Sequence, residues 1–261
     1  MSIAEKLTTI ATNEPKVFEA GNDAGIRAMW EAIQAGGKRT SYPATLFNYC
    51  DYTAKTFKPI YDIKPTGTEA SQWMQFCPSR DGQALLLAEG QVDMKDLEEK
   101  QGIKFDFSGC TALSGAFSGG LFSRLNKIDV SNVTGTLSFT FCGNYINKYE
   151  LRLRRIEELI CSETTKFDST TFNLATELSY VGFEGVIASD INLKASPLNK
   201  ESITKLINTL SSDVTGKTVT LKKTAVNTAF GINVDDETTF PEGSEYYNLR
   251  HSKDNWNISY I

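Results

Sequence analysis

The stretch KIDVSN (127–132) decides the expected fold, because degenerate copies of it recur along the chain. KFDFSG (104–109) precedes it and ELRLRR (150–155) follows it, each at a step of 23 residues. Every copy contains two apolar residues two positions apart, which places both side chains on one face of a short strand. The pairs are Phe105/Phe107, Ile128/Val130 and Leu151/Leu153. A strand that recurs at a period of about 20–29 residues predicts a leucine-rich-repeat solenoid with these side chains inside.

Further segments extend the pattern toward the C-terminus. Segments that approximate Leu-x-x-Leu-x-Leu, with one more strand-like segment after them, are LNKIDV (125–130), IEELIC (156–161), LSYVGF (178–183) and KTVTL (217–221). Phe117 and Phe141 lie 24 positions apart, as expected for a residue that fills the back of each coil. Two strand phases overlap between residues 145 and 165, so the sequence leaves the register there open.

The chain divides into three zones. Residues 1–37 are predicted to be helical, and the apolar stripe Ile3, Leu7, Ile10 and Val17 indicates either an oligomerising or docking stem or a helix packed on its own domain. Residues 38–100 are rich in aromatic residues and proline, which favours a cap on the open end of the core over a binding platform. Residues 101–261 form the repeat domain with its C-terminal cap. The predicted fold class is α/β: a leucine-rich-repeat solenoid with short parallel strands, preceded by an N-terminal helical segment.

The C-terminal region contains regular helical and strand signals. LNKESITKLINTLSS (198–212) is an amphipathic helix with Asn199 as its N-cap. Its predicted buried face is Ile203, Leu206, Ile207 and Leu210. TAVNTAFG (224–231) predicts a second short helix that Gly231 ends, and WNISYI (256–261) alternates like a strand.

Composition narrows the function classes. The chain is 40% hydrophobic and 23% charged with a net charge of −5, so it has no broad electrostatic attraction to nucleic acid or an anionic membrane. No apolar run approaches the roughly 20 residues that span a bilayer, and no secretory signal precedes the repeats. Five dispersed cysteines without a Cys-x-x-Cys pair predict reduced, mostly buried thiols. No cofactor motif is present.

The stretch VDDETTFPEGSEYYNLRHSKDNW (234–256) brings three carboxylates near the chain's single histidine. Asp235, Asp236 and Glu237 are consecutive, so their side chains diverge, and the spacing of an EF-hand loop is absent. We expect a solvated loop that closes the last coil, with His251 at the surface, and neither a metal site nor a catalytic site. A glycosidase needs only two facing carboxylates, so a glycan-cleaving activity stays open as an alternative.

Three arginines form the candidate surface-binding patch. Arg152, Arg154 and Arg155 lie in LRLRR (151–155), where alternation sends Arg152 and Arg154 away from Leu151 and Leu153. The patch is either a site for acidic glycans or, as we favour, a solvated face with cross-strand ion pairs.

Both ends of the chain resemble a family of phage and prophage proteins from gut Firmicutes. IAEKLTTIATNEPKVFEAG (3–21) and the segment from KTVTLKK (217–223) to WNISYI (256–261) resemble the ends of proteins that carry BspA-type leucine-rich repeats between them. The resemblance implies a non-enzymatic virion or tail-associated protein that binds a host-surface glycan or protein. Implied partners are other virion proteins and further copies of the chain, with assembly in the host cytoplasm and release by lysis. The alternatives are a purely structural virion subunit (tail, baseplate or capsid decoration) and a glycan depolymerase.

Overall fold

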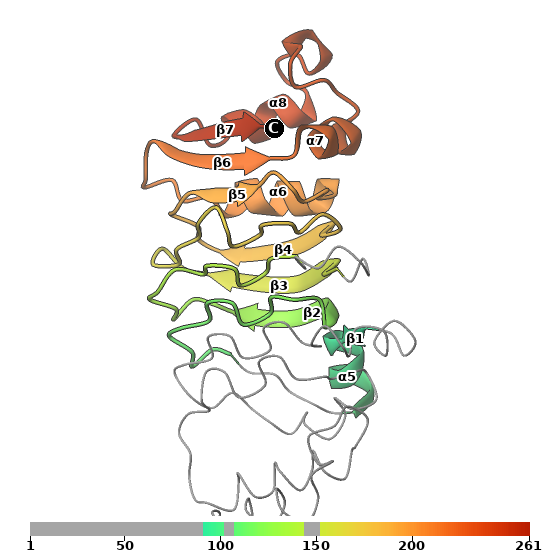
Figure 1. Cartoon of the computed structure of the whole chain (residues 1–261). Helices are drawn as coiled ribbons and strands as arrows, with labels where there is room; N and C mark the ends of the chain where they lie inside the picture. The colour runs from blue at the N-terminus through green and yellow to red at the C-terminus, as the bar shows by residue number, and fades with distance from the viewer. Residues whose placement is uncertain (1–90, 102–106, 144–151) are drawn as a thin grey trace, which may run out of the picture.

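The computed structural model describes residues 91–101, 107–143 and 152–261 (Figure 1). Within these residues the chain is mixed α/β, with short parallel strands in two open sheets. The four-stranded sheet has the order β1-β2-β3-β4 and the three-stranded sheet the order β5-β6-β7, so both follow the order of the chain. The strands are β1 (Val92–Asp93), β2 (Phe122–Asp129), β3 (Arg155–Cys161), β4 (Tyr180–Gly185), β5 (Ile191–Leu193), β6 (Lys217–Leu221) and β7 (Trp256–Tyr260). The helices are α5 (Met94–Gln101), α6 (Lys200–Thr209), α7 (Lys223–Phe230), the 3-10 helix η3 (Glu237–Thr239) and α8 (Glu245–His251).

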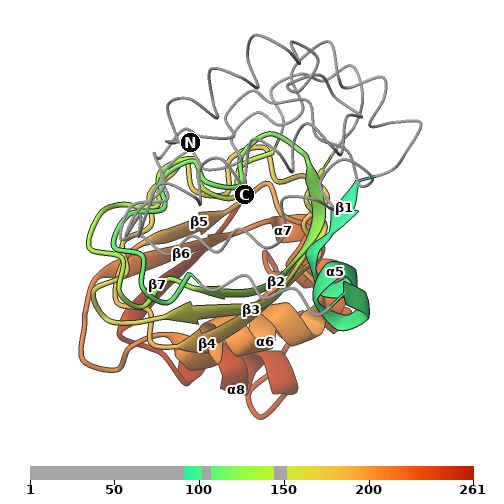
Figure 2. The same ribbon diagram turned by 90° about the horizontal axis from the view of Figure 1, so that it is seen from below.

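The strands form a pile along one axis. Figure 1 shows β2, β3 and β4 one above the next, with β5, β6 and β7 continuing upward. In the view along the pile, β2, β3 and β4 overlap one another, while β5, β6 and β7 form a second group beside them (Figure 2). Helix α6 packs against β4, on the side of the four-stranded sheet. The two sheets therefore occupy different sides of one pile.

Rows of apolar side chains run through the four-stranded sheet. Leu125, Ile156 and Val181 are register partners in β2, β3 and β4, and each is fully buried. Ile128, Leu159 and Phe183 make a second buried row. Parallel pairing brings equivalent positions of successive strands together, so the core extends as continuous rows.

A column of phenylalanine rings crosses the interior behind the strands. The rings of Phe117 and Phe141 stack at 5.8 Å between centroids, and those of Phe141 and Phe172 at 5.4 Å. All three side chains are buried. The predicted filling role of Phe117 and Phe141 is confirmed, and Phe172 extends the column by one layer.

The register of β3 corrects the 23-residue repeat. The predicted strand at 150–155 is wrong at the residues described, because residues 152–154 belong to no strand and β3 begins only at Arg155. Ile128 pairs with Leu159, 31 positions later, rather than with Leu151. The alternative phase, IEELIC (156–161), is therefore the one that enters the sheet.

The predicted inward residues divide into three groups. Ile128 in β2 is buried, as are Val130, which directly follows β2, and Leu153, two residues before β3. Phe107 is also buried, although it lies outside the strands. Phe105, Leu151, the helical segment 1–37 with its stripe Ile3, Leu7, Ile10 and Val17, and residues 38–90 of the predicted cap lie outside the described residues.

A bulge between β3 and β4 depends on a glycine. Glu157 and Glu158 lie between two buried positions of β3, whereas β4 has only Gly182 between the partners of those positions. A Cβ atom on Gly182 would lie 1.9 Å from the carbonyl oxygen of Glu157. Only glycine lets the backbones approach this closely.

The C-terminal predictions hold closely. Asn199 caps α6 by accepting a hydrogen bond from the Ser202 N–H at 2.9 Å. The predicted buried face of α6 is confirmed at every position, with Leu210 as the C-cap residue. Gly231 ends α7 in the left-handed conformation with φ 66°. Cys142 and Cys161 are free thiols, and the three described cysteines Cys110, Cys142 and Cys161 are all buried, as predicted.

Candidate functional site

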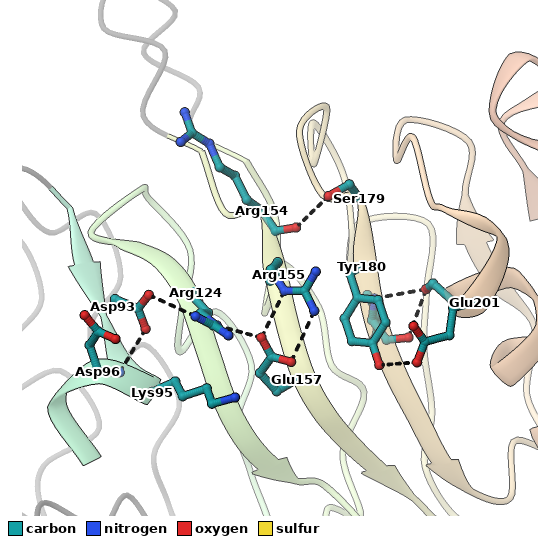
Figure 3. A network of polar contacts seen from close by, with 12 residues as sticks. Asp93, Lys95, Asp96, Arg124, Arg154, Arg155, Glu157, Ser179, Tyr180 and Glu201 are labelled. Carbon is teal, nitrogen blue, oxygen red and sulfur yellow. Dashed lines mark hydrogen bonds and ion pairs between the residues drawn. The ribbon is translucent and has the colours of Figure 1, made fainter. Parts of the chain in front are cut away.

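The outward face of the four-stranded sheet carries one row of polar side chains, one from each strand. Asp93, Arg124, Arg155 and Tyr180 are successive register partners across β1, β2, β3 and β4. We call these four residues the polar row. Figure 3 shows the row, with Glu157 from β3 and Glu201 from α6 beside it. The parallel register therefore joins residues that are far apart in the sequence on one surface.

Glu157 resolves the conflict between the two adjacent arginines. Like charges directly opposite each other on neighbouring strands repel. The Oε1 atom of Glu157 accepts hydrogen bonds from Nε of Arg124 at 2.6 Å and Nε of Arg155 at 2.9 Å. Burial acts to raise the pKa of Glu157, but the hydrogen bonds from Arg155 and Arg124 outweigh it and the pKa is lowered. Glu157 is thus a charged bridge at the centre of the face. At the other end of the row, Arg124 lies 3.5 Å from Asp93.

Tyr180 connects the row to helix α6. The guanidinium carbon of Arg155 lies 4.2 Å from the centroid of the Tyr180 ring, a cation–π contact. The Tyr180 hydroxyl donates to Oε1 of Glu201 at 3.0 Å. Burial, together with the nearby Glu201, raises the pKa of Tyr180 although Lys205 opposes the shift. Tyr180 as a whole is 6% exposed, so it anchors the row rather than offering a free stacking surface.

The arginines predicted from the sequence do not form one patch. Leu153 is buried and Arg154 exposed, as the predicted alternation requires at these two positions. Arg154 donates from Nε to Glu177 at 2.9 Å, whereas Arg155 belongs to the polar row. Figure 3 shows these two side chains pointing in different directions. Arg152 is half-buried, and its carbonyl oxygen accepts from Gln91 at 3.4 Å. Arg154 and Arg155 both form ion pairs, but neither is the cross-strand pair favoured from the sequence: Glu157 lies on the same strand as Arg155, and Glu177 precedes β4. Ligand binding at this patch remains a prediction.

Sequence reasoning missed most of the polar row. The row residues Arg124 and Tyr180 and their partners Glu157 and Glu201 lie up to 77 positions apart and share no local motif. The sequence signal that was available for these residues is their place next to an apolar residue in a strand. That signal identifies outward residues, but it does not say which of them are neighbours.

The acidic loop has three separate partners. Asp235 pairs with Lys223 at 3.0 Å, and Glu237 with Arg250 at 3.7 Å. Asp236 caps η3 by accepting from the Thr238 N–H at 3.1 Å. The three side chains therefore diverge, as predicted, and all three residues are exposed.

His251 has contacts different from those of Asp235, Asp236 and Glu237. It ends α8, and its Nδ1 atom lies 2.9 Å from Oδ1 of Asp254. Its ring packs on Tyr247 with the centroids 4.2 Å apart. Across the part of the chain that the structure describes, no three His, Cys, Asp or Glu side chains are grouped to hold a metal ion.

A shallow hollow of about 350 Å³ lies between the start of α6 and one side of α7. Its lining residues are Pro197, Leu198, Asn199, Lys200, Thr224, Ala225, Thr228 and Ala229. Lys200, the sole charged residue of this lining, pairs with Glu245 at 2.6 Å. Because no carboxylate lines it, the hollow lacks the pair that glycoside cleavage requires.

Comparison with known proteins adds no relative. No protein-family model, no curated protein and no solved structure matches the chain. Among the residues described, no helix has the length and apolar character needed to cross a bilayer.

Proposed function

We propose that the chain is a non-catalytic binding protein of a phage virion, built as a leucine-rich-repeat solenoid. Parallel strands in chain order, continuous apolar rows and the stacked phenylalanine column support successive coils around one core. The resemblance of both chain ends to phage proteins with BspA-type repeats supports the virion setting. The binding partner is a glycan or protein of the host surface.

The polar row is the observation that carries the binding role. Its side chains come from four strands, and intramolecular contacts already fix them in place: Glu157 holds Arg124 and Arg155, and Arg155 contacts Tyr180. A surface whose polar groups are ordered before binding loses less conformational entropy on association. The arginines are neutralised by carboxylates, so recognition at this face relies on directed hydrogen bonds more than on net charge.

The virion setting is tested with particles from a host that carries the gene. Mass spectrometry of purified particles should detect the chain at a constant ratio to the tail proteins. Its absence from particles that still contain their tails would contradict the proposal. The same experiment identifies the neighbouring virion proteins after chemical cross-linking.

The binding role is tested with fluorescent full-length protein on host cells. Arg155→Ala removes the centre of the polar row and should weaken cell binding by about tenfold. Lys217→Ala is the matched control, because Arg155 and Lys217 are strand residues with 40% exposed side chains and one carboxylate partner each. Lys217 lies in the other sheet, so its variant should bind like the unmodified protein.

Three outcomes separate the alternatives. Binding that falls with Arg155→Ala alone supports the recognition face. A chain that is present in particles but binds no cells supports the structural virion subunit. Shortening of a host-surface polysaccharide by the purified protein would support the depolymerase and contradict the non-catalytic proposal.

A further inference from the structure

The two sheets end differently. The last strand of the four-stranded sheet, β4, is closed by α6: the Val181 N–H donates to Oγ of Ser202 at 2.9 Å, and the same hydroxyl donates to the Val181 carbonyl at 2.9 Å. The last strand of the three-stranded sheet, β7, pairs with β6 along one edge. No strand or helix of the described chain pairs with its other edge, and Figure 1 shows β7 as the last strand of the pile.

An open edge strand is a site for pairing with another strand, and proteins usually block such edges with lysine, proline, a bulge or a covering segment. Residues 255–261 (NWNISYI) contain no charged residue and no proline. The register of β6 with β7 is regular over all five pairs, so no bulge twists the edge away. The edge of β7 therefore lacks the protection that Ser202 provides for β4.

The apolar row beneath β7 is also less well covered than the rows inside the pile. Val219 in β6 is 0% exposed, whereas its register partner Ile258 in β7 is 9% exposed. Ile261, the residue after β7, is 67% exposed, one of two large apolar side chains that are exposed among the described residues. A further strand beside β7 would cover this row.

The sequence of β7 is complementary to itself in antiparallel pairing. With Ile258 opposite Ile258 of a second copy, Trp256 faces Tyr260 and Asn257 faces Ser259. Inward apolar residues meet apolar residues, outward polar residues meet polar residues, and no like charges face each other. A two-fold axis repeats the same contacts in both chains, which is how identical subunits form a closed dimer.

We propose that β7 is a dimerisation edge, at which two copies of this chain pair antiparallel about Ile258. The dimer contains one continuous sheet of six strands, with the two piles joined end to end. This interface is separate from the polar row, and it does not depend on what the protein binds.

The test introduces charged residues at the outward positions of the edge. Light scattering on the full-length protein measures the molar mass of each variant. The unmodified chain should have twice the 28.9 kDa mass of one chain. Asn257→Lys with Ser259→Lys places four lysines side by side in the dimer, so the dissociation constant should rise by at least about tenfold and the mass should fall toward one chain. Asn257→Glu with Ser259→Glu should dissociate in the same way.

The matched control lies one strand inward. Thr218 and Thr220 are the register partners of Asn257 and Ser259 on the same face, so Thr218→Lys with Thr220→Lys should leave the dimer intact. An equimolar mixture of the Lys and Glu edge variants should restore the dimer, which also shows that both variants are folded. A monomeric unmodified chain, or edge variants that dimerise as well as the control, would overturn the proposal.

Discussion

The four-stranded and three-stranded sheets share an interior and differ outside. Both bury apolar rows inward, such as Ile128–Leu159–Phe183 and Ile191–Val219–Ile258. Outside, the first sheet carries the charged polar row. In the second sheet the outward residues in matching register are uncharged: Asn192, Thr218, Thr220, Asn257 and Ser259. Its exposed ion pair, Lys217 with Asp190, lies at the start of the strands. The inward residues fix how the strands stack, whereas the outward residues can vary without disturbing the core. The same architecture therefore presents two different surfaces.

The largest expected effect tests the shared interior. Val130→Asp places a carboxylate at a position that is 0% exposed, and an unpaired buried charge should cost at least about 4 kcal/mol of unfolding free energy. Ile258→Asp, on the last strand of the other sheet, should cost less in the separated chain, because water then reaches the edge of β7. Denaturant unfolding measures both variants. Equal losses of unfolding free energy would show that water is excluded equally well from both sheets.

The next effect concerns the bulge, which the three-stranded sheet lacks. Gly182→Ala brings a Cβ atom against the Glu157 carbonyl oxygen, and this overpacking should cost about 3 kcal/mol. Gly135→Ala is the control, because a Cβ there meets nothing within 4 Å; its change should stay within about 0.5 kcal/mol. Thermal unfolding distinguishes them, and a Gly182→Ala protein as stable as the control would mean that the backbones separate at little cost.

A smaller effect is the pH dependence of stability that the charged face of the four-stranded sheet should cause. The pKa of Glu157 is lowered in the folded protein, so its contribution is complete above the pKa of the unfolded chain, about 4.3. That contribution is lost as the pH falls through the lower folded value. Glu157→Gln should therefore reduce stability by about 1–2 kcal/mol at neutral pH and by much less under strongly acidic conditions.

The control for this pH effect is Thr220→Val on the uncharged face. Its stability difference from the unmodified protein should be the same at neutral and acidic pH, because no titrating group is changed. Chemical denaturation at a series of pH values gives both curves. A Glu157→Gln difference that stays constant with pH would contradict the bridging role of the carboxylate.

The smallest effect is expected outside both sheets. Converting Asp235, Asp236 and Glu237 to Asn, Asn and Gln should change stability by less than about 1 kcal/mol, because these exposed side chains make separate surface contacts. Excess calcium should leave the melting temperature unchanged, since a ligand that binds only the folded state raises it. A calcium-dependent rise that the triple substitution abolishes would establish a metal site.

Local signals predicted the C-terminal region well. Asn199, the apolar spacing in α6 and Gly231 act within one or two turns of chain, so the sequence contains all the information they need. KTVTL (217–221) coincides with β6, and WNISY (256–260) with β7. The strand near residue 155 was misplaced because the pairs Leu151/Leu153 and Leu159/Cys161 are both two positions apart in the sequence. Pairing with β2 decides between them, and pairing is a property of two distant segments.

The sequence by itself determined which residues turn inward, because apolar side chains leave water wherever the chain lets them, and the period of two marks their face. It also determined the separate roles of three consecutive carboxylates, because neighbouring side chains diverge. Only the tertiary structure decided the polar row, in which Glu157 bridges Arg124 to Arg155, and the contrast between a closed β4 and an open β7. Both depend on register: a shift of one residue changes every cross-strand neighbour while it leaves local propensity unaltered.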